Sequence, residues 1–157
     1  MSDSALLGES HTFDAVLEPL VWGRSTYVVL RLPAAVVEAA AAAGTRRVAG
    51  TVDGVEVNLA VTRADVLGEP FLWAGAGLRR RLGAAPGDVV ACRLAPVYPD
   101  HVPVPPDVRE AVDAAGLGPA FDALRPAEQR RRLVPVEDAV RPDTRARRVA
   151  DLVASLP

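Results

Sequence analysis

Few residues of this chain could do chemistry, and an arginine-rich segment near the C-terminus holds two of them. The segment reads RPDTRARR over residues 141–148. Pro142 is typical of the first position of a helix. Helical spacing then predicts an apolar face formed by Ala146, Val149, Val153 and Leu156. Arg145 falls on that face, Arg148 lies on its border, and Arg147 points the opposite way, towards water.

An arginine on an apolar face must find a partner, and two kinds of partner satisfy it. Arg145 and Arg148 could bind an anionic ligand such as a phosphate. Alternatively, Arg145 packs its stem on the rest of the fold and pairs with a carboxylate or with carbonyls at a helix end. The structural interpretation is favoured, because buried charges in proteins are usually paired internally. Both residues are retained as candidate ligand-binding positions.

Two further residues complete the set of candidate ligand-binding positions. His101 lies near Tyr98 and Asp100, and a histidine beside a carboxylate can do acid–base work. Trp73 stands beside small residues and could line a cleft. The sequence has no serine–histidine–acid pattern and no HExxH or CxxC motif. We therefore expect no catalytic residues, no metal site and no cofactor, and Cys92 is expected to be a core residue.

The length, composition and charge of the chain exclude several classes of protein. A chain of 157 residues, half of them hydrophobic, can bury a real core. Its 18 basic residues are all arginines and face 20 carboxylates, which gives a net charge of −2. A general nucleic-acid binder needs uncompensated cations, so a nucleic-acid partner is not expected. No secretory or membrane-spanning segment is visible, and we expect a cytoplasmic location with no membrane partner.

Residues 1–97 are predicted to form a small body rich in β-structure. Strands are expected over 12–20 and 26–32, joined at Gly23, and around Phe71 to Trp73. Asp53-Gly54 predicts a tight hairpin between two further strands, because Asp-Gly suits a type I′ turn. Helices are expected after Pro33 and before Gly83, where a glycine can end a helix in the left-handed conformation.

Residues 98–106 are rich in proline and are predicted to be a linker. A helical segment is expected over 107–157, in short pieces that begin near prolines. Those prolines are Pro106, Pro119, Pro126, Pro135 and Pro142.

The order of these parts resembles an uncharacterised bacterial family. The run FLWAGAGLRRRLGAAPGDVVACRL is similar to the strand–helix–turn–strand element of AbrB-like double-split β-barrels. The tail resembles the helical segment called YdeI or OmpD-associated, or bacteriocin-protection. Its pattern matches residues 124–130 and 141–148. Gly44-Thr45-Arg46 is similar to a Gly-Thr-Arg stretch of the same family.

The resemblance implies a fold and suggests a function. The fold class expected is mainly β with helices (α+β), a six-stranded double-split β-barrel with a C-terminal helical tail packed on it through Arg145. The function expected is non-enzymatic, as a small-molecule- or peptide-binding or stress-tolerance protein. A nucleic-acid-binding, regulator-like barrel protein and an enzyme of unknown reaction are the alternatives.

Overall fold

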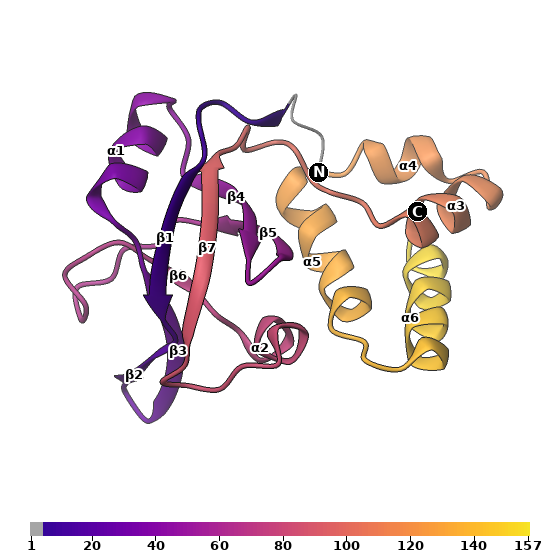
Figure 1. Cartoon of the computed structure of the whole chain (residues 1–157). Helices are drawn as coiled ribbons and strands as arrows, with labels where there is room; N and C mark the ends of the chain where they lie inside the picture. Colours follow the sequence, from indigo (N-terminus) through magenta and orange to yellow (C-terminus); the bar gives the residue numbers. More distant parts are fainter. Residues whose placement is uncertain (1–4) are drawn as a thin grey trace. The chain divides into compact units, whose positions relative to one another are not determined.

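The structure is a computed structural model that describes residues 5–157 (Figure 1). Strands interrupted by two helices extend to residue 96, and only helices follow. The strands are β1 (His11–Val16), β2 (Glu18–Trp22), β3 (Ser25–Arg31), β4 (Arg47–Val52), β5 (Val55–Ala60), β6 (Phe71–Trp73) and β7 (Val89–Pro96). The helices are α1 (Ala34–Ala42), α2 (Ala76–Leu82), α3 (Pro106–Ala114), α4 (Gly118–Asp122), α5 (Pro126–Glu137) and α6 (Pro142–Ala154). The predicted α+β class is confirmed.

The chain divides into two compact units, Met1–Pro99 and Asp100–Pro157. The first unit holds a four-stranded sheet in the order β1-β7-β4-β5 and a three-stranded sheet in the order β2-β3-β6. Every pairing in the two sheets is antiparallel. The described residues thus form seven strands in two sheets, where six strands were predicted. The double-split barrel arrangement itself stays a prediction.

The extra strand arises at Leu17, where the strand predicted over 12–20 is divided. The Leu17 N–H donates to the Asp88 carbonyl at 2.9 Å, and its own carbonyl accepts from the Gly87 N–H at 2.7 Å. Its side chain is fully buried. Residues before Leu17 pair with β7, and residues after it pair with β3. The predicted hairpin at Gly23 is therefore correct for β2 and β3 only.

The main core of the first unit is aliphatic. Its buried members include Leu30, Val36, Val48, Leu72 and Leu94, drawn from both sheets and from α1. Cys92 belongs to the same core, as predicted. Burial alternates residue by residue only in the first part of β7, from Val89 to Leu94, as in a sheet with one buried face. In β3 and β6, neighbouring residues are buried on both faces of the sheet.

Two tight turns follow the predicted chemistry. Asp53 and Gly54 both have positive φ, 46° and 77°, as a type I′ turn between β4 and β5 requires. The Asp53 carboxylate also accepts a hydrogen bond from the Ala91 N–H at 2.7 Å, which ties the turn to β7. Gly83 ends α2 in the left-handed conformation, with φ 62°. Both predictions are confirmed.

The second unit has its own apolar core. Fully buried members are Val108 and Val112 of α3, Phe121 of α4, and Leu133 and Val136 of α5. Pro106, Pro126 and Pro142 each occupy the first position of a helix, as predicted. Pro135 does not start a helix, and that prediction is wrong. It lies inside α5 near its end, where only one backbone hydrogen bond is lost.

Helix α6 buries a face slightly different from the predicted one. Val149 and Leu156 are buried, but Ala146 is exposed and Leu152 is buried in its place. Val102 and Val104 of the proline-rich stretch pack against this helical core. Packing of the helical segment on the first unit stays a prediction.

Candidate functional site

Three aromatic side chains gather on one face of the three-stranded sheet. Trp22 of β2 and Trp73 of β6 are stacked, with ring centroids 6.2 Å apart and planes 9° apart. The Tyr27 ring of β3 lies 5.2 Å from Trp73 and 6.4 Å from Trp22, tilted against both. Trp22 is 47% exposed and Tyr27 is 43% exposed. We call these three residues the aromatic cluster.

Strand register explains why these rings meet. Tyr27 lies opposite Leu20, and Trp73 lies opposite Val29, so all four side chains share one face of the sheet. Phe71, two residues before Trp73, is on the same face, and its ring meets Trp73 edge-on at 4.9 Å. The opposite face of the sheet carries Leu30 and Leu72 into the main core.

One end of this face is covered and the other is open. Leu20, Val29 and Phe71 are buried there beneath Ala64 and Leu67 of the loop between β5 and β6. The aromatic cluster continues the same apolar surface beyond that cover. Exposed large aromatics next to one another mark a binding surface more often than isolated apolar residues do.

A pocket of about 340 Å³ opens beside Trp73. Its lining residues are Thr26, Tyr27, Val28, Trp73, Ala74, Gly75, Ala76 and Arg79. Arg79 Nη1 donates to the Ala74 carbonyl at 2.6 Å, which holds the guanidinium at the pocket. Trp73 therefore lines a pocket, and its predicted role in ligand binding stays a prediction.

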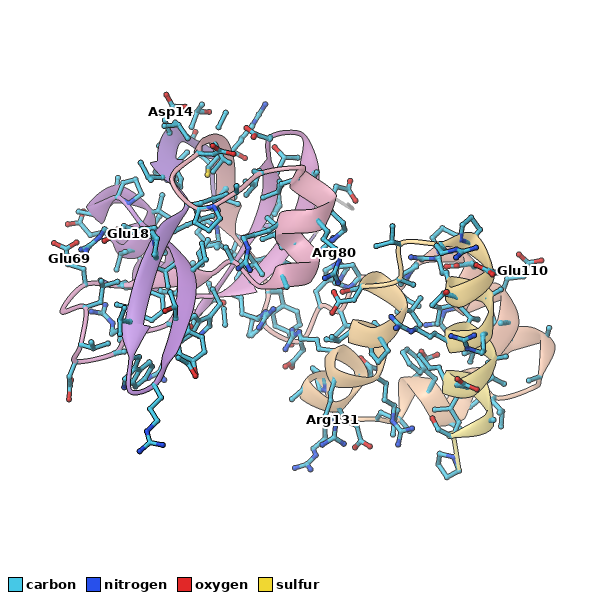
Figure 2. All side chains as sticks on the ribbon, turned by 90° about the horizontal axis from the view of Figure 1, so that it is seen from below. Asp14, Glu18, Glu69, Arg80, Glu110 and Arg131 are labelled. Atoms are coloured by element: carbon cyan, nitrogen blue, oxygen red, sulfur yellow. The ribbon has the colours of Figure 1, made fainter. Side chains whose placement is uncertain are left out.

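The charges at the covered end of the face are neutralised. Arg31 donates from Nε to Glu18 at 2.6 Å and from Nη1 to Glu69 at 3.0 Å. Figure 2 shows these two carboxylates close together at the edge of the first unit. The hydrogen bond from Arg31 lowers the pKa of Glu18 below its ordinary value. This end of the sheet thus carries an ion-paired group, whereas the cluster end is apolar and aromatic.

The structure gives the two predicted arginines of α6 partners inside the second unit. Arg145 donates to both carboxylate oxygens of Asp107 and, from Nη1, to the Val136 carbonyl at 3.3 Å. Arg148 Nη1 donates to the Pro135 carbonyl at 2.7 Å. Both carbonyls are at the end of α5, where cations are favourable. The expectation that the partner of Arg145 belongs to the first unit is wrong, and its ligand role stays a prediction.

His101 lies at the start of the second unit. Its backbone carbonyl accepts a hydrogen bond from Arg130 Nη2 at 3.3 Å. The Asp100 carboxylate acts on the same guanidinium, and it opposes the lowering of the pKa of Arg130 by burial. Both members of the acid–base pair that the sequence suggested, His101 and Asp100, therefore interact with the side chain of Arg130. A ligand role for His101 stays a prediction.

Of the three residues of the aromatic cluster, only Trp73 was among the candidate ligand-binding positions predicted from the sequence. The spacing of Trp22 and Tyr27 from Trp73 in the sequence carried no signal, because the pairing of β3 with β6 spans more than forty residues. A usable signal was the hairpin at Gly23. It places Trp22 at the end of β2 and Tyr27 two residues into β3, close to each other beside the turn.

Among residues 5–157, no group of three or more histidine, cysteine or carboxylate side chains could hold a metal ion. None of the helices described combines the length and hydropathy of a membrane span.

Two family models match consecutive parts of the chain. The model described as a domain of unknown function (DUF1905) matches residues 13–94, more than half of the chain. The chain belongs to this family. The model described as "Bacteriocin-protection, YdeI or OmpD-Associated" matches residues 101–157. No curated protein and no solved structure matches the chain.

These matches confirm the order of the two parts that the sequence resemblance implied. The first match covers most of the unit that carries the aromatic cluster, and the second covers the helical unit. The AbrB-like character of the first part stays a prediction.

Proposed function

We propose that this protein is a non-enzymatic binding protein that holds a flat, largely apolar small molecule against Trp73. The observation that carries the proposal is the exposure of the aromatic cluster beside a pocket. The chain has only two tryptophans and two tyrosines, and three of these four residues lie in the cluster. Core packing alone would bury such rings rather than leave two of them almost half exposed.

The size and chemistry of the pocket support a small ligand. Its volume of about 340 Å³ lies within the range of small-molecule sites, about 300 to 1,000 Å³. The lining contains no histidine, cysteine or carboxylate. It offers an aromatic wall from Trp73 and Tyr27 and a guanidinium from Arg79. Such a lining supports stacking and hydrogen bonding rather than acid–base chemistry.

The family description of the helical unit suggests a biological role for ligand binding. Bacteriocin protection is what that description names. A protein that sequesters an apolar toxic compound would increase tolerance to it. We extend a stress-tolerance role to this chain as part of the same proposal.

Tryptophan fluorescence tests the proposal directly, because both tryptophans of the chain are in the cluster. The probe is N-phenyl-1-naphthylamine, a neutral flat molecule, titrated into the full chain. We expect saturable quenching of tryptophan emission with energy transfer to the probe. Replacing Trp73 with Leu should weaken binding about tenfold or more, since stacking on one aromatic ring contributes about 1 to 3 kcal/mol.

Trp22→Phe is the matched control. Each variant keeps one tryptophan as reporter, but Trp22→Phe also keeps a ring stacked on Trp73, so it should bind within about threefold of the wild type. Absence of saturable binding, or equal binding by both variants, would overturn the proposal. Tighter binding of N-acetylphenylalanine amide or of a short oligothymidylate would reassign the site to peptides or to single-stranded nucleic acid.

A further inference from the structure

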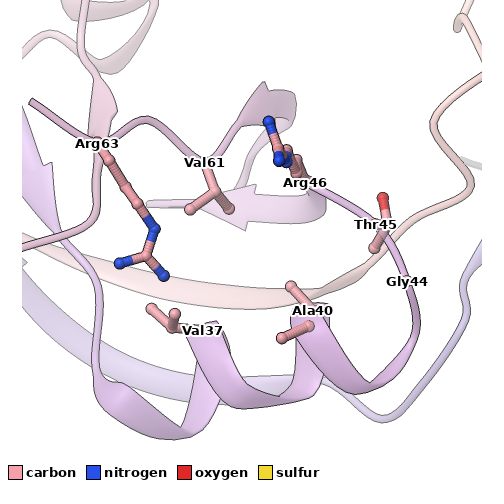
Figure 3. Close-up of a pocket in the computed structure, with 8 residues that line it drawn as sticks. Val37, Ala40, Gly44, Thr45, Arg46, Val61 and Arg63 are labelled. Atoms are coloured by element: carbon pink, nitrogen blue, oxygen red, sulfur yellow. The ribbon is translucent and has the colours of Figure 1, made fainter.

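A second pocket in the first unit carries two arginines that have no partner among the described residues. Its volume is about 550 Å³, and Figure 3 shows it between α1 and the segment that follows β5. The lining residues are Val37, Ala40, Ala41, Gly44, Thr45, Arg46, Val61 and Arg63. None of them belongs to the aromatic cluster or to the pocket beside Trp73.

The register of the sheet brings the two arginines to one side. The Val61 N–H donates to the Arg46 carbonyl at 2.7 Å, which continues the β4–β5 ladder by one pair. Residues directly opposite in a ladder share a face, so the Cβ atoms of Arg46 and Val61 leave the strands on the same side. Arg63 is two residues further along the extended chain and shares that face. Figure 3 shows the Arg63 guanidinium reaching over Val37.

Both guanidinium groups are unpaired among residues 5–157. In that part of the chain, no carboxylate lies within ion-pair distance of Arg46 or Arg63, whereas Arg31 of the same unit pairs with Glu18 and Glu69. The nearby Thr45 hydroxyl is already occupied, because it donates to the Val97 carbonyl at 2.8 Å. Two uncompensated cations over one pocket leave a local positive field in a chain whose net charge is negative.

The C-terminal end of α1 lies beside the pocket, and its carbonyls would repel a bound anion only weakly. Its last carbonyls would repel negative charge if they were free. Here the N–H groups of Ala43, Gly44 and Thr45 donate to the carbonyls of Ala39, Ala41 and Ala40. The helix end is therefore capped by its own backbone, and the arginines dominate the charge at the pocket.

The geometry points to a binding site for a small phosphate ester with an apolar body. A carboxylate has two oxygens and is satisfied by one arginine fork, whereas a phosphate monoester offers three oxygens that two guanidinium groups can share. The pocket is also larger than an inorganic phosphate needs. Its floor is formed by Val37, Ala40 and Val61, which suits an apolar group attached to the phosphate.

Isothermal titration calorimetry of the full chain with phenyl phosphate tests this site. We expect 1:1 binding that weakens with added salt, and a loss of about tenfold or more in affinity in either Arg46→Gln or Arg63→Gln. Both arginines are exposed, so neither substitution should unfold the protein. Arg93→Gln is the matched control, because Arg93 is an exposed arginine of the same unit outside the pocket.

Two companion titrations identify the ligand chemistry. Inorganic phosphate should bind about tenfold or more weakly than phenyl phosphate, because it leaves the apolar floor uncovered. Benzoate should also bind more weakly, because it engages one arginine only.

Absence of binding by phenyl phosphate, or equal binding by Arg93→Gln and the two pocket variants, would overturn the site. Equal affinity for inorganic phosphate would contradict the proposal that the ligand has an apolar body. Tighter binding of benzoate would contradict the proposal that its anionic group is a phosphate. These outcomes are independent of the proposal for Trp73, which is read by tryptophan emission at a different pocket.

Discussion

The guanidinium of Arg145 holds both carboxylate oxygens of Asp107, from Nε at 2.7 Å and from Nη2 at 3.0 Å. The pair joins the first turn of α6 to the first turn of α3, 38 residues away. Its third donor reaches the Val136 carbonyl at the end of α5. One arginine thus joins three helices of the second unit.

Replacing Arg145 with Ala should destabilise the protein by about 1 to 2 kcal/mol. Hydrogen bonds to charged groups are worth about 1.5 to 3 kcal/mol, and we discount this because the side chains of the pair are 33% and 45% exposed. Lys should restore only part of the loss, because it lacks the planar fork. Denaturant unfolding measures the difference. Arg147→Ala, on the exposed side of α6, is the control and should change stability by less than about 0.5 kcal/mol.

Acid should remove the contribution of the same pair. The hydrogen bond from Arg145 lowers the pKa of Asp107 in the folded state below its ordinary value of 3.8, and burial acts in the opposite direction. A carboxyl group with a lowered folded pKa stabilises the fold above its unfolded pKa, and this stability is lost as the pH falls through the folded pKa. The stability difference between wild type and Asp107→Asn should therefore be full at pH 6 and shrink below about pH 4. A difference that stayed constant down to about pH 2 would contradict the assignment.

Gly50 should not tolerate a side chain. It is in the middle of β4 with φ 152°, and an added Cβ would overlap the Arg93 carbonyl oxygen of β7. Because backbone rather than a flexible side chain stands in the way, Gly50→Ala should cost about 3 kcal/mol or more. Thermal unfolding is the measurement. Gly75→Ala, where an added Cβ meets nothing within 4 Å, should leave the melting temperature nearly unchanged.

The single thiol should be inert in the folded protein. Cys92 is 1% exposed, and burial, aided by the charges of Asp53 and Asp14, raises its pKa to about 11. At pH 8 the reactive thiolate is then scarce, about one molecule in a thousand. Reaction with Ellman's reagent should be about a hundredfold or more slower in buffer than in concentrated guanidinium chloride. Similar rates in the two solvents would show that the thiol is accessible.

Local signals in the sequence were sufficient for much of the fold. The turn at Asp53-Gly54 and the end of α2 at Gly83 depend on backbone conformations that only a few residue types adopt easily, so the sequence identifies them. Pro142 likewise identified the start of α6. The order of the two parts followed from motifs within each part.

Contacts between distant segments could not be predicted in the same way. Nothing local indicates that β1 pairs with β7, about eighty residues away, or that the chain changes sheets at Leu17. The partner of Arg145 was missed for the same reason, because helical spacing gives a face but not the neighbour of that face. The partners of Trp73 in the aromatic cluster required the pairing of three strands.

The location of the two tryptophans also affects how unfolding of this protein would be observed. Both belong to the first unit, whereas most helical residues of the described chain belong to α3, α4, α5 and α6 of the second. Tryptophan emission therefore reports the melting of one unit, and helical circular dichroism mainly reports the other. If the two curves fail to coincide, the cause need not be an intermediate within either core, because the two probes report different units.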